Sequence, residues 1–363
     1  MKPSTNRRRQ FLKQSLAATF AAPFSNLGLL DSPIDSQVFG GININRSDAL
    51  PISGTFLDEI SHDIPHQNWG ESEWDADFRY MKAIGIDTVI MIRAGYRKFI
   101  TYPSKYLRKK GCYTPSVDLL DMFLRLADTY GMKFYFGLYD SGKYWDTGDL
   151  SLEVEYNKYV IDEVWEAYGK KYKSFGGWYI IGEISRKTKG AIMAFREMGK
   201  QCKDVSGGLS TFISPWIDGK KAVMSSAGKI SKIDAVSVQE HERDWDEIFD
   251  GISGAVDICA FQDGHIDYDE LDAFFSVNKK LADKYQIACW TNAETFDRDM
   301  PIKFLPIKFD KLRLKLEAAA RTGFDKAITF EFSHFMSPQS AYLQAGHLYK
   351  RYRDFFDLDR STQ

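Results

Sequence analysis

Residues 71–92 read ESEWDADFRYMKAIGIDTVIMI, and the fold is decided by the pattern of this stretch. Residues 71–84 mix polar and apolar side chains as an amphipathic helix does, and Gly85 can end that helix in the left-handed conformation. Residues 88–92 form a short β-branched and apolar run, which is typical of a buried strand. A helix is thus predicted to lead directly into a strand, as in parallel α/β sheets.

The same unit recurs on both sides of this stretch. Gly131 and Gly323 also stand between a predicted helix and the next strand. Eight strands are predicted, at residues 52–57, 88–92, 133–138, 177–181, 210–213, 257–261, 287–290 and 327–332. Eight helices are predicted, at residues 71–84, 116–130, 152–172, 189–205, 244–252, 268–284, 310–322 and 340–355. Eight such units close a single (β/α)8 TIM barrel, so we expect this α/β fold over residues 51–357.

An open nucleotide-binding sheet is the alternative fold. It would more often stop at five or six strands, and no glycine-rich phosphate loop follows the first predicted strand. The fifth unit is irregular, because residues 233–238 could form a small extra strand inside a long loop over residues 220–243. The barrel remains the favoured prediction.

The amino terminus has the pattern of a targeting signal. Arg7, Arg8 and Arg9 precede the sequence QFLK and a mildly apolar, alanine-rich run at residues 15–24, as in twin-arginine signals. We expect residues 1–30 to be this signal with a linker, residues 31–50 an amino-terminal extension and residues 358–363 a tail. No run approaches the ~18 apolar residues of a membrane span. The sequence predicts export by the twin-arginine machinery to the periplasm or beyond, with no permanent membrane span.

Composition narrows the class of ligand. The 48 Lys and Arg residues and 50 Asp and Glu residues nearly cancel, so no overall field would attract nucleic acid. The four cysteines show no CxxC spacing and the six histidines no HxH or HExxH spacing, so we expect neither a metal nor another cofactor. A neutral or weakly acidic ligand is the expectation.

The predicted strand ends give the candidate site. In barrels of this kind, side chains that act on ligands lie at the carboxyl ends of strands and in the loops that follow. Glu183 follows the fourth strand and Glu294 follows the seventh, and these two are the candidates for catalysis. The candidates for substrate binding are Glu59, Arg93, Tyr139, Asp140, Trp145, Trp216, Gln262, Asp263, Asn292 and Glu331.

This mixture of side chains suits a carbohydrate. Sugar rings stack their C–H faces on aromatic rings, and their hydroxyls bind carboxylates, amides and arginine. Cleaving a glycosidic bond requires two carboxyl groups, one protonated and one ionised. We therefore expect a glycoside hydrolase acting on an oligo- or polysaccharide. A carbohydrate-binding barrel without hydrolytic chemistry is the alternative, and a metal-dependent hydrolase or isomerase is a third and less favoured one.

Residues 177–183, which read GWYIIGE, resemble the fourth strand of retaining clan-A glycoside hydrolases, which carries the acid/base glutamate. The nucleophile of that clan ends strand seven. The resemblance implies that Glu183 is the acid/base and Glu294 the nucleophile, with carboxyl groups about 5 Å apart. Clan members usually place Asn directly before the acid/base, where this chain has Gly182. Gln262 or Asn292 would then bind the sugar 2-hydroxyl instead.

A longer part of the chain, from ISGTFL at residues 52–57 through FQDG at residues 261–264, resembles a poorly characterised group of exported bacterial barrels described as glycosyl-hydrolase-like. This resemblance covers most of the barrel. It implies the same fold and general activity but no particular substrate.

Several candidates also have a purely structural interpretation. Glu183 could cap a helix or pair with Arg186, and Glu294 could be an exposed loop carboxylate, since it lies beyond its strand. Glu331 follows Thr329 and Phe330 and is the substitute for Glu294, because a carboxylate in an apolar strand needs a partner or a raised pKa. Asp140 and Asp263 could be turn formers.

Trp145 and Trp216 lie in predicted loops, which favours stacking on a sugar. Residues 108–110, RKK, are interpreted as a solvated face.

Overall fold

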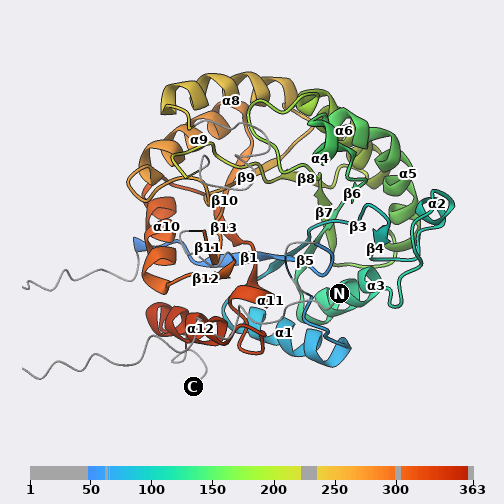
Figure 1. The fold of residues 1–363 in the computed structure, drawn as a ribbon, viewed down its shortest axis with the longest axis horizontal. Coiled ribbons are helices and arrows are strands. Elements are labelled where there is room, and N and C mark those ends of the chain that lie inside the picture. The colour runs from blue at the N-terminus through green and yellow to red at the C-terminus, as the bar shows by residue number, and fades with distance from the viewer. Residues whose placement is uncertain (1–47, 62–63, 65, 222–234, 299–303, 359–363) are drawn as a thin grey trace, which may run out of the picture. The chain divides into compact units, whose positions relative to one another are not determined.

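Eight parallel strands form a closed barrel in the computed structural model (Figure 1), which describes residues 48–61, 64, 66–221, 235–298 and 304–358. In order around the barrel the strands are β1 (Ile52–Leu57), β2 (Thr88–Met91), β5 (Lys133–Gly137), β7 (Phe175–Tyr179), β8 (Ser210–Ile213), β9 (Ile258–Gln262), β10 (Ala288–Asn292) and β13 (Lys326–Thr329). β13 pairs with β1 and closes the ring. The predicted (β/α)8 fold is confirmed.

Helices surround this barrel on the outside (Figure 1). The longer ones are α1 (Glu71–Ala83), α3 (Leu119–Tyr130), α5 (Val154–Val164), α6 (Ala191–Ser206), α8 (Val238–Ile252), α9 (Leu271–Tyr285), α10 (Phe309–Arg321) and α12 (Leu343–Phe356). Shorter elements are α2 (Lys105–Lys109), α4 (Lys143–Thr147), α11 (Phe332–Phe335), and the hairpin of β11 (Phe296–Asp297) with β12 (Leu305–Pro306). The predicted signal at residues 1–30, the extension up to residue 47 and tail residues 359–363 lie outside the described part of the chain.

The fifth unit differs from its prediction. α8 begins at Val238, six residues before the predicted start, because Ser237 and Glu240 form a capping box: the Ser237 hydroxyl accepts from the Glu240 amide at 3.2 Å, and the Glu240 carboxylate accepts from the Ser237 amide at 3.1 Å. Residues 235–237 of the small strand predicted at 233–238 are not in a strand, and residues 233–234 lie outside the described part. That prediction is wrong for the residues that can be seen.

Aromatic rings fill the inside of the barrel. The ring of Phe56 on β1 lies 5.1 Å from that of Tyr179 on β7, which lies 5.0 Å from Phe212 on β8. Phe212 in turn lies 5.6 Å from Trp290 on β10. Edge-to-face and offset contacts at these separations stabilise packed aromatic clusters. The interior is therefore a solid core, and a ligand can reach only the rim.

A small sheet adds to the rim between β2 and α3. β3 (Gly95–Tyr96) pairs with β4 (Phe99–Ile100) in antiparallel fashion and with β6 (Tyr139–Asp140) in parallel. Since β3 follows β2 and β6 follows β5, this sheet continues two barrel strands beyond their carboxyl ends. It places Asp140 at the barrel mouth.

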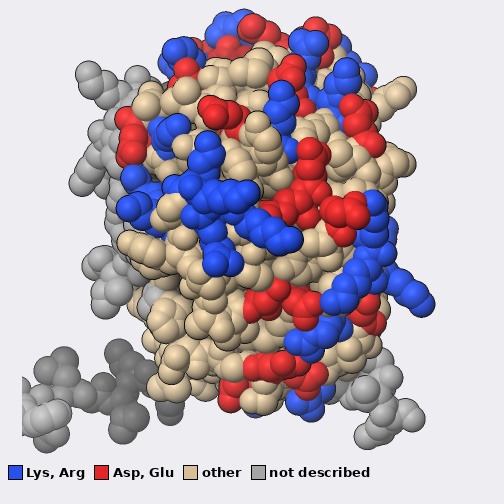
Figure 2. Space-filling model, turned by 90° about the vertical axis from the view of Figure 1, so that its right-hand side faces the viewer, with Lys and Arg blue, Asp and Glu red and all other residues tan. Residues whose placement is uncertain are grey.

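The surface carries both signs of charge. Figure 2 looks at the side on which α2, α3 and α5 lie in Figure 1, and it shows acidic and basic side chains spread over this face, with the basic ones gathered most densely in one group. No helix among the described residues combines the length and apolar character needed to cross a membrane.

Candidate active site

Glu183 lies four residues beyond the end of β7, yet its backbone is still held by the neighbouring segment. The Ile180 amide donates to the Phe212 carbonyl at 2.9 Å, and the Trp216 amide donates to the Ile184 carbonyl at 3.1 Å. Residues 180–184 therefore continue the line of the strand to the rim of the barrel. The Glu183 side chain is 32% exposed there.

Gly182 explains why the usual Asn is missing before this glutamate. Its φ is +132°, a conformation that side chains of L-residues rarely adopt. A Cβ added here would also lie 3.0 Å from Cδ2 of Leu150, which is tighter than an ordinary van der Waals contact. Only glycine fits this position without strain.

Arg93 connects Glu183 to Asp140. Its guanidinium lies 3.0 Å from Oδ2 of Asp140 and 4.0 Å from Oε1 of Glu183, and the residue is only 8% exposed. Burial by itself lowers the pKa of Arg93, but the carboxylates of Asp140, Glu183 and Asp58 more than offset it, so that pKa is raised. Arg93 is therefore a fixed cation beside the Glu183 carboxylate.

Aromatic side chains border a hollow beside Glu183, which is lined by residues of β6, α4 and the end of β7 and by the segments that follow β2 and β7. The Trp145 indole N–H donates to Oδ2 of Asp140 at 2.8 Å, and the Tyr144 hydroxyl donates to the Glu183 carbonyl at 2.6 Å. Asp140 also accepts from the Gly142 amide at 2.8 Å, so it forms a turn and at the same time orients both Arg93 and Trp145. Arg186 lies 3.5 Å from Asp218 and also binds Asp244.

Glu294 is held in the same manner beyond β10. The Ala293 amide donates to the Ile328 carbonyl at 2.9 Å, and the Thr295 amide donates to the Phe330 carbonyl at 3.0 Å. Glu294 is consequently 2% exposed, so its interpretation as an exposed loop carboxylate is wrong. The extra residues after the strand remain part of the barrel wall.

Arg298 binds both oxygens of the Glu294 carboxylate. Its Nε lies 2.8 Å from Oε2 and its terminal nitrogen 2.7 Å from Oε1, the paired geometry that suits a guanidinium and a carboxylate. Burial works to raise the pKa of Glu294, but the charge and hydrogen bonds of Arg298 outweigh it and hold that pKa below its usual value. Glu294 is thus an ionised carboxylate at neutral pH.

Asp263 and Lys315 hold the backbone of Glu294 in place. The Lys315 ammonium donates to Oδ1 of Asp263 at 2.7 Å and to the Glu294 carbonyl at 3.2 Å, and the Glu294 amide donates to the same Asp263 oxygen at 3.1 Å. Burial raises the pKa of Asp263, and its attraction to Lys315 only partly opposes that effect. These contacts make Asp263 a support for Glu294 more than a ligand for sugar.

Both glutamates act electrostatically on Arg298. Burial lowers the pKa of Arg298, but the charges of Glu294, Glu183 and Asp263 more than offset it, so that pKa is raised. Glu183 also contributes to raising the pKa of Arg93.

Polar groups without partners border the Glu294 half of the site. Neither ring nitrogen of His265 has a hydrogen-bond partner in the structure, although the residue is only 3% exposed, and burial lowers its pKa to about 4. Oδ1 of Asn292 is unpartnered as well, while its amide nitrogen donates to Ser214 at 3.1 Å. The amide nitrogen of the Gln262 side chain donates to the Ser214 carbonyl at 2.7 Å. Asn292 and His265 therefore retain capacity for a ligand's hydroxyls.

The predicted platform tryptophan is nearly covered. Trp216 is 7% exposed, its ring lies 5.9 Å from that of His265, and its indole N–H donates to Asp218 at 2.9 Å. Tyr139 is similarly engaged, because its hydroxyl donates to the Arg97 carbonyl. Both side chains mainly shape the walls of the mouth.

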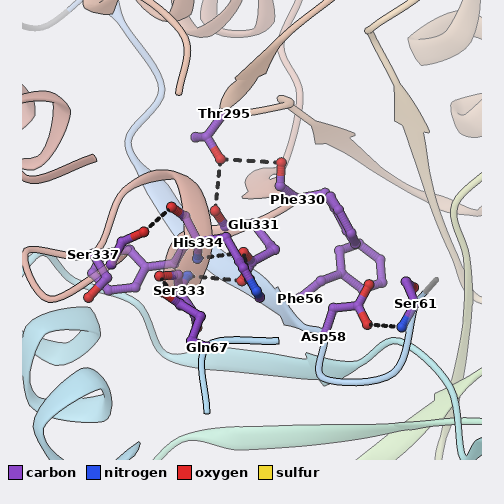
Figure 3. A network of polar contacts seen from close by, with 12 residues as sticks. Phe56, Asp58, Ser61, Gln67, Thr295, Phe330, Glu331, Ser333, His334 and Ser337 are labelled. Carbon is purple, nitrogen blue, oxygen red and sulfur yellow. Dashed lines mark hydrogen bonds and ion pairs between the residues drawn. The ribbon is translucent and has the colours of Figure 1, made fainter. Parts of the chain in front are cut away.

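Glu331 caps α11. Its carboxylate accepts from the Ser333 amide at 2.9 Å and from the His334 amide and Nδ1 at 2.6 Å each, and these contacts lie beside Asp58 and Gln67 in Figure 3. This cap also ends β13 at Thr329, three residues before the predicted strand end. Because its oxygens are committed to backbone amides and His334, Glu331 is a poor substitute for Glu294.

Glu59 lies near this cap and has an unusual ionisation. Burial raises the pKa of Glu59 to about 7, with further contributions from Glu331 and Asp58 and opposition from His334. One of its oxygens has no hydrogen-bond partner. Glu59 is therefore a carboxyl group that is part protonated near neutral pH.

Sequence reasoning named most residues of this mouth but missed Arg298 and Lys315. Arg298 follows Glu294 by four residues, a spacing that could have indicated a partner, whereas Lys315 lies on α10 and reaches Glu294 only through the fold. Within the described residues, no group of three or more His, Cys, Asp and Glu side chains is arranged to hold a metal ion.

Known proteins resemble this chain in family and in fold. A family model described as "Domain of unknown function (DUF4434)" matches residues 52–342. The crystal structure of "a putative alpha-L-fucosidase" from Bacteroides thetaiotaomicron VPI-5482 is 74% identical, covers 93% of this chain and 100% of that chain, and has a TM-score of 0.84. No curated protein matches the chain.

More distant structures share the barrel alone. The endo-1,4-beta-mannanase from Rhizomucor miehei is 12% identical with a TM-score of 0.52, over 78% of this chain and 86% of that chain. The endo-1,4-beta-D-mannanase from Thermotoga petrophila RKU-1 is 11% identical with a TM-score of 0.50, over 78% of this chain and 88% of that chain.

Proposed function

The chain belongs to the DUF4434 family, and we propose that it is a retaining glycoside hydrolase in which Glu183 is the acid/base and Glu294 the nucleophile. The relative from Bacteroides thetaiotaomicron, which is described as "a putative alpha-L-fucosidase", supports a glycosidase. The proposed roles rest on the residues of this chain.

One observation carries the proposal. Glu183 and Glu294 follow β7 and β10, which are separated by two strands in the ring, and each lies within ion-pair distance of a different arginine. Glu294 is buried, ionised and held on both oxygens, as suits a nucleophile that must attack in one fixed orientation. Glu183 is partly exposed beside a hollow, as suits a group that exchanges protons with leaving group and water.

The reaction would proceed in two displacements. Glu183 gives its proton to the glycosidic oxygen while Glu294 attacks the anomeric carbon, which breaks the bond to the leaving group and forms a glycosyl ester on Glu294. Glu183 then takes a proton from water, whose oxygen attacks the same carbon and frees Glu294. Arg298 must loosen its hold on one carboxylate oxygen for the attack. Asn292 is the residue best placed to bind the sugar 2-hydroxyl, since Gly182 cannot.

The substrate is a neutral or weakly acidic glycan. The relative's description makes an aryl α-L-fucoside the first compound to test. Plant, microbial and host oligosaccharides complete the panel. Trp145, fixed by Asp140, offers a ring on which a sugar can stack.

Kinetics of two variants test the proposal on the substrate that the panel identifies. Glu183→Gln should lower kcat/KM by about 10²–10⁴-fold for a poor leaving group and much less for dinitrophenyl glycosides, which leave without protonation. Glu294→Gln should abolish turnover of both kinds of substrate. Glu197→Gln, on the exposed side of α6, is the control and should change neither value.

Stereochemistry separates the remaining possibilities. Proton NMR of the first product should show the same anomer as the substrate, and inversion would contradict Glu294 as a nucleophile. Binding of oligosaccharide with no turnover by the parent protein would instead favour the non-hydrolytic carbohydrate-binding barrel.

Export through the twin-arginine pathway is part of the same proposal. Residues 1–30 fused to a reporter should direct it to the periplasm, and Arg8→Lys with Arg9→Lys should retain it in the cytoplasm.

A further inference from the structure

One segment of the chain concentrates positive charge. Residues 94–117, which form the insertion between β2 and α3, contain six Lys and Arg residues and no Asp or Glu, in a chain whose formal net charge is −2. The six are Arg97, Lys98, Lys105, Arg108, Lys109 and Lys110. Positive charge in this short insertion is therefore not balanced by any carboxylate of its own.

Most of these cations have no acidic partner. Arg97 binds Asp146, but no carboxylate in the described part of the chain lies within ion-pair distance of Lys98, Arg108, Lys109 or Lys110, all of which are exposed. Several exposed basic side chains elsewhere do lie in ion pairs. Lys284, for example, lies 2.6 Å from Asp246. The insertion therefore presents uncompensated charge, in agreement with the dense basic group seen from the side of α2 in Figure 2.

Exposed aromatic rings accompany this charge. Phe99 is 61% exposed and Tyr113 55% exposed, and their ring centroids lie 5.4 Å apart in an edge-to-face arrangement. The Tyr113 amide donates to the Lys98 carbonyl at 2.8 Å, which joins the aromatic pair to the basic residues. Tyr106 of the same insertion stacks on Tyr159, which is 53% exposed, with 4.5 Å between the ring centroids. Exposed apolar side chains that lie together, as Phe99 and Tyr113 do, are a feature of binding surfaces.

The insertion is also joined to the mouth. β3 lies at its start and pairs with β6, where Asp140 binds Arg93 and Trp145. The surface formed by Lys98, Phe99, Arg108, Lys109, Lys110 and Tyr113, here called the basic aromatic surface, is therefore a lateral extension of the rim.

We propose that the basic aromatic surface is a second binding site, for an anionic polysaccharide whose chain carries carboxylate or sulfate groups. Lysine and arginine side chains neutralise the acidic groups, and the open rings stack on the C–H faces of the sugars between them. An anionic membrane would use the charge alone, and a single-stranded nucleic acid would use both the cations and the rings. The junction of this surface with the rim, through β3 and β6, favours a polysaccharide. The site is separate from the proposed hydrolytic carboxylates and extends what the barrel can hold.

Affinity electrophoresis of the full chain tests this site with three probes: polygalacturonate, dextran sulfate and uncharged dextran. The two anionic polymers should retard the protein and dextran should not. Replacing Arg108, Lys109 and Lys110 together by Ser should weaken the binding of polygalacturonate by about tenfold or more, since each exposed ion pair contributes modestly. Phe99→Ala with Tyr113→Ala should also weaken it.

A charge-matched control excludes a general polyelectrolyte effect. Lys280, Lys284 and Arg321 are exposed and paired with carboxylates, and replacing them by Ser removes the same three charges. This control should bind as the parent does. Equal weakening in the control, no effect of the aromatic variant, or tighter binding to phosphatidylglycerol vesicles or DNA than to polygalacturonate would overturn the proposal.

Turnover distinguishes this site from the active site. Hydrolysis of a small aryl glycoside should be unchanged in all variants of the basic aromatic surface. If no glycoside is hydrolysed at all, the proposed function fails while retardation by polygalacturonate still decides the binding site.

Discussion

Replacing Arg298 by Met would remove the cation that holds both oxygens of Glu294. The contacts of 2.8 and 2.7 Å join a guanidinium to a carboxylate that is only 2% exposed. An opposite charge at this range lowers a carboxyl pKa by about 1–3 units, so its removal should raise the pKa of Glu294 by about that amount. Burial, which already works to raise this pKa, would then be opposed mainly by Lys315.

The sign of the effect on activity follows from the ionised form. In the parent protein the pKa of Glu294 lies below its usual 4.5, so the carboxylate remains charged in weak acid. In Arg298→Met the nucleophile would be protonated at a higher pH, and the acidic limb of kcat/KM should move upward by about 1–3 pH units. Arg298→Lys keeps the charge without the paired geometry and should shift the limb less.

The assay is kcat/KM for an aryl glycoside between pH 3 and pH 9, with ¹³C NMR of labelled glutamate carboxyl groups as a readout that does not need turnover. An acidic limb and a Glu294 resonance that both titrate as in the parent would refute the electrostatic role of Arg298. Circular dichroism of both variants shows whether they remain folded.

Three further substitutions have defined outcomes. Burial raises the pKa of Glu59 to about 7, so its ionisation destabilises the fold as pH rises from about 4.5 through 7; Glu59→Gln should therefore raise Tm relative to the parent more at pH 8 than at pH 5, and an equal difference at both would contradict this. His265→Ala should raise KM about tenfold with little change in Tm, because its unpartnered nitrogens are available to substrate. Lower Tm with unchanged KM would make His265 scaffold only. Gly182→Ala should reduce the free energy of unfolding by about 1–3 kcal/mol in urea titrations, and no loss would show that φ of +132° is not restrictive.

The order of elements could be predicted because it follows from local pattern. Neighbouring residues in the sequence are enough to recognise an apolar strand, an amphipathic helix or a glycine that ends a helix. Gly131, which has a φ of +61°, is one such glycine. The residues at which helices and strands begin and end were harder to predict from the sequence. The start of α8 depends on a capping box at Ser237, and the end of β13 depends on the cap that Glu331 forms for α11.

The site was predictable by residue type but not by role. Glu183 and Glu294 could be located because strand ends meet at one rim. That Glu294 is buried follows from backbone pairing of Ala293 and Thr295 with residues far away in sequence, and its support by Lys315 follows from the packing of α10. Contacts of this kind form only when the barrel closes, so they cannot be predicted from local sequence patterns.

The backbone that continues beyond β7 and β10 also determines when the catalytic carboxylates become oriented. Because the backbone next to both glutamates is already hydrogen-bonded to neighbouring segments, the carboxylates are oriented when the chain folds, and little reorganisation is left for the moment of reaction. Adaptation to different glycans should then fall to the irregular loops and the insertion after β2. In a barrel built in this way, substrate specificity can change while the catalytic carboxylates keep their positions.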